Sequence, residues 1–371
     1  LSTIKLVVLG DVSPSVLGRT LTHEHLSMDF SHFYSEPPQQ LADQFQRLPY
    51  SLDMIGYIRQ YPYSSPFNLL MNDKDANTAV LNDLLAYKKF GGGTIVENTT
   101  EGIKRNVKTY KELSEASGVH VVAGAGHYVA DTQVKSNLKL SSEDMYNQML
   151  KDMTEGCTEA PEIKAGFLGE IGSVWPIRDF ERKAIIAAGE LQSQLKCGVS
   201  FHPHRTPEAP FEIIRLYLEA GGSADKAVMS HLDRTIKDHE RLLEFSDLGT
   251  YCQFDLFGTE VSHYQLCVSI DMPSDAARMD MVAHLVNEGK EDRVMIVLMS
   301  HNIHTKHRLL SYWTILNHSE GILLFIEYGG HGFSHIINNI LPRLKSNKGL
   351  SQETIDKITI TNPARWLEIK N

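Results

Sequence analysis

Eight short apolar runs, separated by longer amphipathic segments, constrain the fold of this chain more than any other feature of its sequence. The runs are expected to form strands at residues 19–25, 93–98, 120–124, 166–170, 199–202, 227–231, 250–255 and 293–301. Strands that alternate with helices form right-handed βαβ units and therefore a parallel sheet. We expect a single α/β domain with the closed (β/α)8 architecture of a TIM barrel, and an open, doubly wound sheet is the alternative.

Local signals also predict individual helices between these strands. Residues 73–90 carry apolar side chains at helical spacing and are followed by three glycines, which favour a helix end. Thr206, Pro207 and Glu208 together are typical of a helix start, because they supply a cap, a first-turn proline and an early acid. We expect this second helix to run to Gly221.

No composition shift or low-complexity linker divides the chain, so residues 1–371 are expected to form one domain. This length suits one barrel with insertions. Residues 31–72, rich in tyrosine and proline, follow the first expected strand and are predicted to be an insertion that partly covers one mouth of the barrel.

Composition argues against several classes of partner. The net charge of −10 disfavours nucleic acids and anionic membranes, so we expect neither as a partner. Four well-separated cysteines without a CxxC spacing indicate reduced thiols and a cytoplasmic protein. The N-terminal residues lack the pattern of a signal peptide, and no apolar run is long enough to span a bilayer. The sequence does not determine the oligomeric state, and a homodimer is the candidate assembly.

Two histidines, His23 and His25, lie two residues apart at the end of the first expected strand. Side chains two apart on a strand share one face, so both imidazoles would point the same way. Neutral imidazole nitrogen is a good ligand for zinc and similar metals. Alone, the pattern is weak, because a chance or hydrogen-bonded pair is more common.

Metal-compatible residues also end three other expected strands, namely Glu170, His202 and His231. In a parallel barrel the carboxyl ends of the strands surround the catalytic cavity, so these residues should converge with the histidine pair. Any one of them alone could be a buried residue bonded to the backbone. Five such residues at four strand ends indicate a metal site.

Four histidines and one carboxylate suit two divalent ions per chain, with zinc as the expected metal. The two oxygens of Glu170 could bridge the ions while the histidines divide two and two. A hydroxide shared by the ions would attack a carbonyl or phosphoryl centre. The other histidines near strand ends are expected to orient ligands or to lie at the surface; they are His127, His204, His301, His304 and His307.

Three further residues are candidates for substrate contact. Arg205 and Arg234 each follow an expected ligand, so both are predicted at the rim of the cavity, where a guanidinium would bind a carboxylate or sulfonate of the substrate. Equally, each could pair with a local acid such as Asp233. Tyr128 follows the third expected strand and is a candidate to polarise the scissile carbonyl.

Several of these motifs resemble the phosphotriesterase family, within the metal-dependent amidohydrolase superfamily of (β/α)8 barrels. The similar stretches cover residues 17–25, 91–99, 169–172, 229–235, 255–260 and 304–308. The resemblance implies that His23 and His25 bind one ion and that His202 and His231 bind the other. It places Glu170 where bacterial phosphotriesterases carry a carboxylated lysine.

The resemblance also implies a substrate class. It suggests hydrolysis of small, anionic N-acyl amides, with N-acetyltaurine favoured and related N-acetyl amino acids next. A lactonase or phosphotriesterase activity is the alternative. A barrel that binds ligand without turnover is the other alternative.

Two features depart from the family pattern. The family has an aspartate after the eighth strand that binds a metal and relays a proton, whereas this chain has Asn302. An amide oxygen coordinates weakly and is no general base, so we expect activity reduced by orders of magnitude. A natural change and a sequence error both fit Asn302. Residues 313–328 are an apolar segment that relatives lack, either an extra helix or lid or a retained intron.

Overall fold

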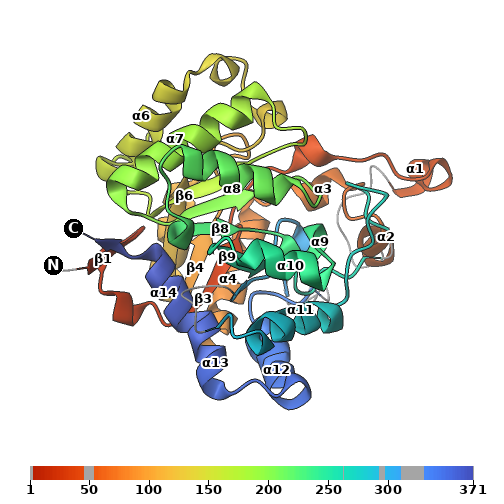
Figure 1. Ribbon diagram of the computed structural model, residues 1–371. Coiled ribbons are helices and arrows are strands. Elements are labelled where there is room, and N and C mark those ends of the chain that lie inside the picture. Colours follow the sequence, from red (N-terminus) through yellow and green to blue (C-terminus); the bar gives the residue numbers. More distant parts are fainter. Residues whose placement is uncertain (1–2, 46–53, 262, 292–296, 311–329, 371) are drawn as a thin grey trace.

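The eight expected strands form one parallel sheet in the computed structural model, which describes residues 3–45, 54–261, 263–291, 297–310 and 330–370 (Figure 1). The strands are β3 (Arg19–Glu24), β4 (Gly92–Glu97), β5 (His120–Ala125), β6 (Phe167–Gly172), β7 (Val199–His202), β8 (Ala227–Met229), β9 (Tyr251–Phe254) and β10 (Val297–Met299). Their order in the sheet follows their order in the chain. The last strand lies beside the first, and the Asn302 N–H donates to the His23 carbonyl at 3.1 Å. The prediction of a closed barrel is therefore confirmed.

Helices follow the strands and surround the barrel (Figure 1). They are α4 (Lys74–Lys89), α5 (Val107–Ser117), α6 (Ser142–Thr154), α7 (Asp179–Leu195), α8 (Ala209–Glu219), α9 (Leu232–Thr235), α10 (His239–Ser246), α11 (Asp275–Asn287), α12 (Leu341–Lys348), α13 (Gln352–Asp356) and α14 (Asn362–Leu367). Within the described ranges, no helix combines the length and the apolar character needed to cross a membrane.

The two helices predicted from local signals have different outcomes. Helix α4 begins after Asp73, whose carboxylate accepts from the Ala76 N–H at 2.7 Å, and it ends at the predicted glycines. Helix α8 begins at Ala209, two residues later than predicted, with Glu208 instead of Thr206 at the cap position. The reason is that the Thr206 hydroxyl contacts His204 Nδ1 at 2.9 Å and so does not cap the helix.

The segment after β3 is an insertion that covers the mouth of the barrel, as predicted. It contains α1 (Gln39–Phe45), α2 (Ile55–Gln60) and α3 (Pro66–Leu69). Tyr63 Oη lies 3.0 Å from His304 Nε2, and Asn68 Oδ1 accepts from the His307 N–H at 2.9 Å, so the insertion is tied to the loop after β10. The other predicted extra segment, residues 313–328, lies outside the described residues.

The two ends of the chain meet in a small sheet that the sequence did not predict. Strand β1 (Thr3–Val7) pairs antiparallel with β2 (Gly10–Val12) and with β11 (Ile369–Lys370). Figure 1 shows these strands at the opposite side of the molecule from α1 and α2. A buried cluster joins Trp366 to Phe167 and Tyr251, the first residues of β6 and β9. This end of the barrel is therefore filled, and the site must lie at the other end.

A buried carboxylate joins the first and last strands of the barrel. Glu24 Oε1 accepts from the Ser300 hydroxyl (2.7 Å), the His301 N–H (2.7 Å) and His301 Nδ1 (2.8 Å), while Oε2 accepts from the Ile303 N–H (2.8 Å). Burial opposes ionisation, but His301 and the surrounding donors lower the pKa of Glu24. Glu24 therefore holds the loop that carries Asn302 against β3.

Replacing Glu24 with glutamine should destabilise the fold. The amide NH2 would face donors that now meet a carboxylate, so we expect the free energy of unfolding to fall by about 2–4 kcal/mol in chemical denaturation. The control Glu115→Gln changes an exposed carboxylate of α5 and should shift it by less than about 0.5 kcal/mol. Equally small effects in both variants would contradict the role given to Glu24.

Candidate metal centre

Five predicted ligand residues gather at the carboxyl end of the barrel around the Glu170 carboxylate. Glu170 Oε2 lies 2.9 Å from His202 Nδ1, 3.5 Å from His23 Nε2 and 3.8 Å from His231 Nε2. Glu170 Oε1 lies 3.9 Å from His25 Nε2. The structure thus brings all five residues together, while their role as metal ligands stays a prediction.

The donor set fits a divalent cation. Three groups of three residues are compatible with a metal; two contain Glu170, namely His23, His25 and Glu170, and Glu170, His202 and His231, and the third is His23, His231 and Asp255. The first two groups share Glu170, as a bridging carboxylate requires. His23 Nε2 is buried without a hydrogen-bond partner. Because buried ring nitrogens are normally paired, this free nitrogen points to a missing ligand.

The electrostatics of the cluster also suit a cation. Burial lowers the pKa of His25 to about 4 and lowers the pKa of His23, His202 and His231 well below the usual value. The imidazoles are therefore neutral near pH 7, with lone pairs available for a metal. Burial, with the nearby Asp255, raises the pKa of Glu170. A bound cation would stabilise its ionised form.

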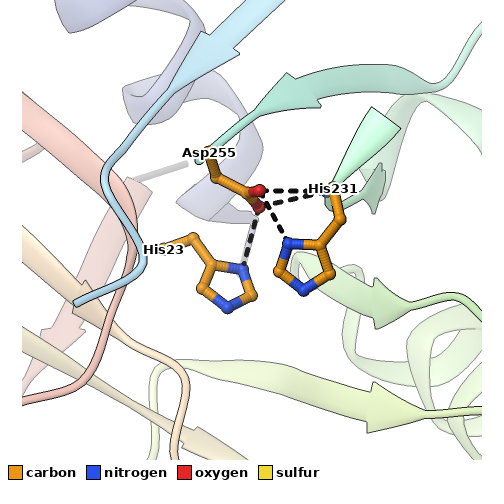
Figure 2. Close-up of side chains that lie close together, drawn as sticks. All are labelled: His23, His231 and Asp255. Atoms are coloured by element: carbon orange, nitrogen blue, oxygen red, sulfur yellow. Dashed lines mark hydrogen bonds and ion pairs between the residues drawn. The ribbon is translucent and has the colours of Figure 1, made fainter. Parts of the chain in front are cut away.

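A second carboxylate, Asp255, contacts His23 and His231 (Figure 2). Asp255 Oδ1 lies 2.7 Å from His231 Nδ1, and Asp255 Oδ2 lies 3.3 Å from His23 Nδ1. These are the ring nitrogens on the far side from Glu170. Asp255 thus holds the His231 ring, and it flanks His23 Nδ1 together with Ser230 Oγ at 3.0 Å, so that both Nε2 atoms face the centre. No role was predicted for Asp255, although it is the last residue of an expected strand, the same signal that identified the other residues.

Asn302 lies beside the centre in the left-handed backbone region, with φ of 48°. Asparagine tolerates this conformation better than most residues. Its carbonyl accepts from His304 Nδ1 at 2.7 Å and from Arg308 Nη1 at 2.8 Å. Its side chain interacts with His25, and the residue lines the same cavity as His25. The side chain is therefore placed beside a predicted metal ligand and at the wall of the cavity.

The predicted substrate residues line this cavity of ≈ 30 Å³. Tyr128 Oη lies 3.2 Å from His202 Nε2, and Arg234 Nη2 lies 3.5 Å from the same nitrogen. Arg205 donates through Nη2 to Tyr264 Oη at 2.8 Å. Burial raises the pKa of Tyr128 further above its usual value, so its hydroxyl stays protonated.

The alternative that Arg205 and Arg234 pair with Asp233 is wrong. Asp233 Oδ2 instead accepts from Arg278 Nε at 2.9 Å. Among the described residues, no carboxylate forms an ion pair with either arginine, and Arg234 Nη1 is buried without a partner.

The remaining histidines contact other groups and belong to none of the metal-compatible groups found in the described ranges. His127 packs edge-on to Phe180, His204 contacts Thr206, His301 contacts Glu24, His304 contacts Tyr63 and His307 contacts Asn68. Their expected roles, to orient ligands or to lie at the surface, stay predictions.

Comparisons with known proteins extend the result. The sequence profile of the phosphotriesterase family matches residues 5–367. The phosphotriesterase-related protein of Aedes aegypti is 53% identical over 363 residues, which are 96% of each chain. A resiniferatoxin-binding protein from Rhodobacter sphaeroides superposes with a TM-score of 0.88 at 25% identity, over 98% of this chain and 94% of that chain. A lactonase from Listeria monocytogenes superposes with a TM-score of 0.74 at 20% identity, over 99% and 100%.

Fold and site together define a metal-dependent hydrolase built on a (β/α)8 barrel. The chain belongs to the phosphotriesterase family, because the family profile covers nearly its whole length and its relatives are about half identical.

Replacing Asp255 with asparagine should weaken metal binding. An amide has one acceptor oxygen, so its NH2 would face a donor of His231 and turn the ring. We expect a loss of about 10–100-fold in zinc affinity, measured by competition with a chelator. The control Asp238→Asn changes a carboxylate at the start of α10 and should leave zinc affinity unchanged. Equal zinc affinities in both variants would contradict the role given to Asp255 in metal binding.

Proposed function

We propose that this protein hydrolyses small N-acyl amides that carry an anionic group, with N-acetyltaurine and N-acetyl amino acids as the candidate substrates. The observation that carries the proposal is the pair Arg205 and Arg234, which line the cavity of the metal centre and form no ion pair with a carboxylate of the described chain.

Two neighbouring cations that form no ion pair favour an anionic ligand, although Arg234 also interacts at longer range with Glu170 and Asp255. Arg234 is 3% exposed, and burial together with Arg205 lowers the pKa of its guanidinium. A buried cation is unfavourable unless it is paired. A substrate carboxylate or sulfonate would pair with both guanidinium groups and hold the substrate in one orientation.

The small cavity favours a short acyl group. Its volume is only ≈ 30 Å³. Leu256, Leu266 and Met272 supply apolar side chains to its wall. An acetyl group matches such a wall better than a long acyl chain does.

The residues divide the chemistry between them. We propose that His23 and His25 would hold one zinc ion, that His202 and His231 would hold the other, and that Glu170 would be shared by both, with Asn302 as a weak neutral ligand. Bound ions would lower the pKa of a water and polarise the acyl carbonyl. The protonated Tyr128 hydroxyl would donate to the carbonyl oxygen. Asn302 cannot accept the proton of the attacking water, so turnover would be slow.

Two alternatives use the same residues. The first is a lactonase or phosphotriesterase, and the Listeria neighbour is a lactonase, although its likeness reaches only the fold. The second is a relative impaired in catalysis, which Asn302 favours. We also propose a cytoplasmic location, supported by Cys157, Cys197, Cys252 and Cys267, all of which are free thiols.

A substrate panel tests the proposed reaction. We expect kcat/KM for N-acetyltaurine to exceed that for N-acetylethanolamine, a lactone and paraoxon, because only the first carries an anion for the arginines. Arg234→Gln should lower kcat/KM for N-acetyltaurine by about 10–100-fold, since a charged hydrogen bond contributes about 1.5–3 kcal/mol. The same substitution should change kcat/KM for N-acetylethanolamine, the neutral amide, much less. The control Arg215→Gln alters an exposed arginine of α8. Faster turnover of the lactone would favour the alternative.

Replacing Asn302 with aspartate should increase activity. The new carboxylate adds charge to the metal site and can accept a proton, and we expect kcat to rise by about 100-fold or more. Purified wild-type protein should carry about two zinc ions per chain by plasma mass spectrometry, and the variant should hold them more tightly. The control Asn106→Asp keeps the acceptor that caps α5. No gain in kcat or zinc affinity would show that Asn302 does not limit the site.

A further inference from the structure

Thr99, just beyond the carboxyl end of β4, contacts a predicted metal ligand. Its Oγ1 lies 2.9 Å from His25 Nδ1, and the same hydroxyl donates to Glu97 Oε1 at 2.6 Å. Glu97 and Thr99 are fully buried, and His25 is 2% exposed. The chain thus contains a connected row of three side chains that runs from β4 to the centre.

Glu97 also fixes the backbone on both sides of this row. Its Oε1 accepts from the Leu26 N–H at 3.1 Å, directly after His25, and its Oε2 accepts from the Thr99 N–H at 3.1 Å. One carboxylate therefore positions the residue that follows His25 and the residue that contacts its ring.

The single proton of the Thr99 hydroxyl determines which ring nitrogen of His25 is protonated. A threonine hydroxyl has one proton, and here Thr99 donates it to Glu97. Thr99 can offer His25 only a lone pair, so His25 Nδ1 must carry the proton. His25 Nε2 then keeps its lone pair, and this nitrogen faces Glu170 Oε1 at 3.9 Å.

We propose that Glu97, acting through Thr99, is a positioning residue that fixes the tautomer and the ring orientation of His25 for metal binding. This inference rests on the metal centre of the proposed function. Asp255 holds His231, and Ser230 with Asp255 flanks His23, whereas His25 depends on this separate row from β4. The two arrangements follow the rule that ligating imidazoles are held through their second nitrogen.

Burial raises the pKa of Glu97 to about 8, so most of this carboxyl carries a proton at pH 7. Oε1 already accepts from both Leu26 N–H and Thr99 Oγ1, which favours placing any proton on Oε2. The Thr99 hydroxyl then donates to Oε1 whether Glu97 is ionised or protonated.

Two substitutions at Thr99 isolate the hydroxyl. Thr99→Val keeps the shape and removes the acceptor, and Thr99→Ser keeps the hydroxyl. We expect Thr99→Val to weaken the more loosely bound zinc ion by about 10–100-fold in chelator competition, while Thr99→Ser stays within about threefold of wild type. In the cobalt-loaded protein, Thr99→Val should also change the visible absorption of the metal. The control Thr94→Val removes a buried hydroxyl of the same strand, which donates to Leu17 O, and should leave zinc affinity unchanged.

A double-mutant cycle tests whether Glu97 acts through Thr99. Glu97→Met removes both acceptor oxygens and should weaken zinc binding about as much as Thr99→Val does. If the two residues act in one row, the double variant should be no weaker than Thr99→Val alone. Additive losses would overturn the proposed order of action.

Three results separate this inference from the proposed function. Wild-type protein that binds no metal would overturn both. Wild-type protein that binds zinc but cleaves no amide would overturn only the proposed reaction. Equal zinc affinity and cobalt absorption in wild type and Thr99→Val would overturn only the inference. Thermal unfolding of each metal-free variant confirms folding, and Thr99→Ala replaces Thr99→Val if that variant does not fold.

Discussion

Glu24 accepts hydrogen bonds from Ser300, His301 and Ile303, and so joins the first strand of the barrel to the segment after the last. It lies between His23 and His25, so the residue that closes the barrel is flanked by two predicted ligands. The same segment carries Asn302, whose N–H donates to His23. Alternation along β3 explains this arrangement, because neighbouring side chains of a strand point to opposite sides. Barrel closure and the geometry of the metal centre therefore depend on one short strand.

The centre is held by residues that do not themselves face the cavity. Asp255 holds His231, Ser230 with Asp255 flanks His23, and the row from Glu97 holds His25. Each outer contact is to a ring Nδ1, which leaves Nε2 toward Glu170. His202 is the exception, because its Nδ1 faces Glu170 and its Nε2 lies near Tyr128 and Arg234. This ring lies between the predicted ligands and the predicted substrate groups, so it connects metal binding to substrate orientation.

The fold alone does not identify the substrate, since similar barrels include a resiniferatoxin-binding protein and a lactonase. The distinguishing features of this chain are the two arginines without a carboxylate partner, the small cavity and Asn302. The arginines and the cavity favour a small anion. Compared with the aspartate of the family pattern, Asn302 removes a negative charge beside the centre and keeps nearly the same side-chain shape. We therefore expect it to lower the rate.

The sequence by itself determined the barrel and the five residues around Glu170, because both follow from local rules. Period-two alternation pairs His23 with His25, and parallel strands bring their carboxyl ends to one face. Tertiary structure decided the rest. Asp233 pairs with Arg278, 45 positions away, and Thr206 turns to His204 instead of capping α8. Asp255 and Glu97 gain their roles only through contacts between different strands. Such contacts depend on where distant segments meet, and no local spacing in the chain specifies that.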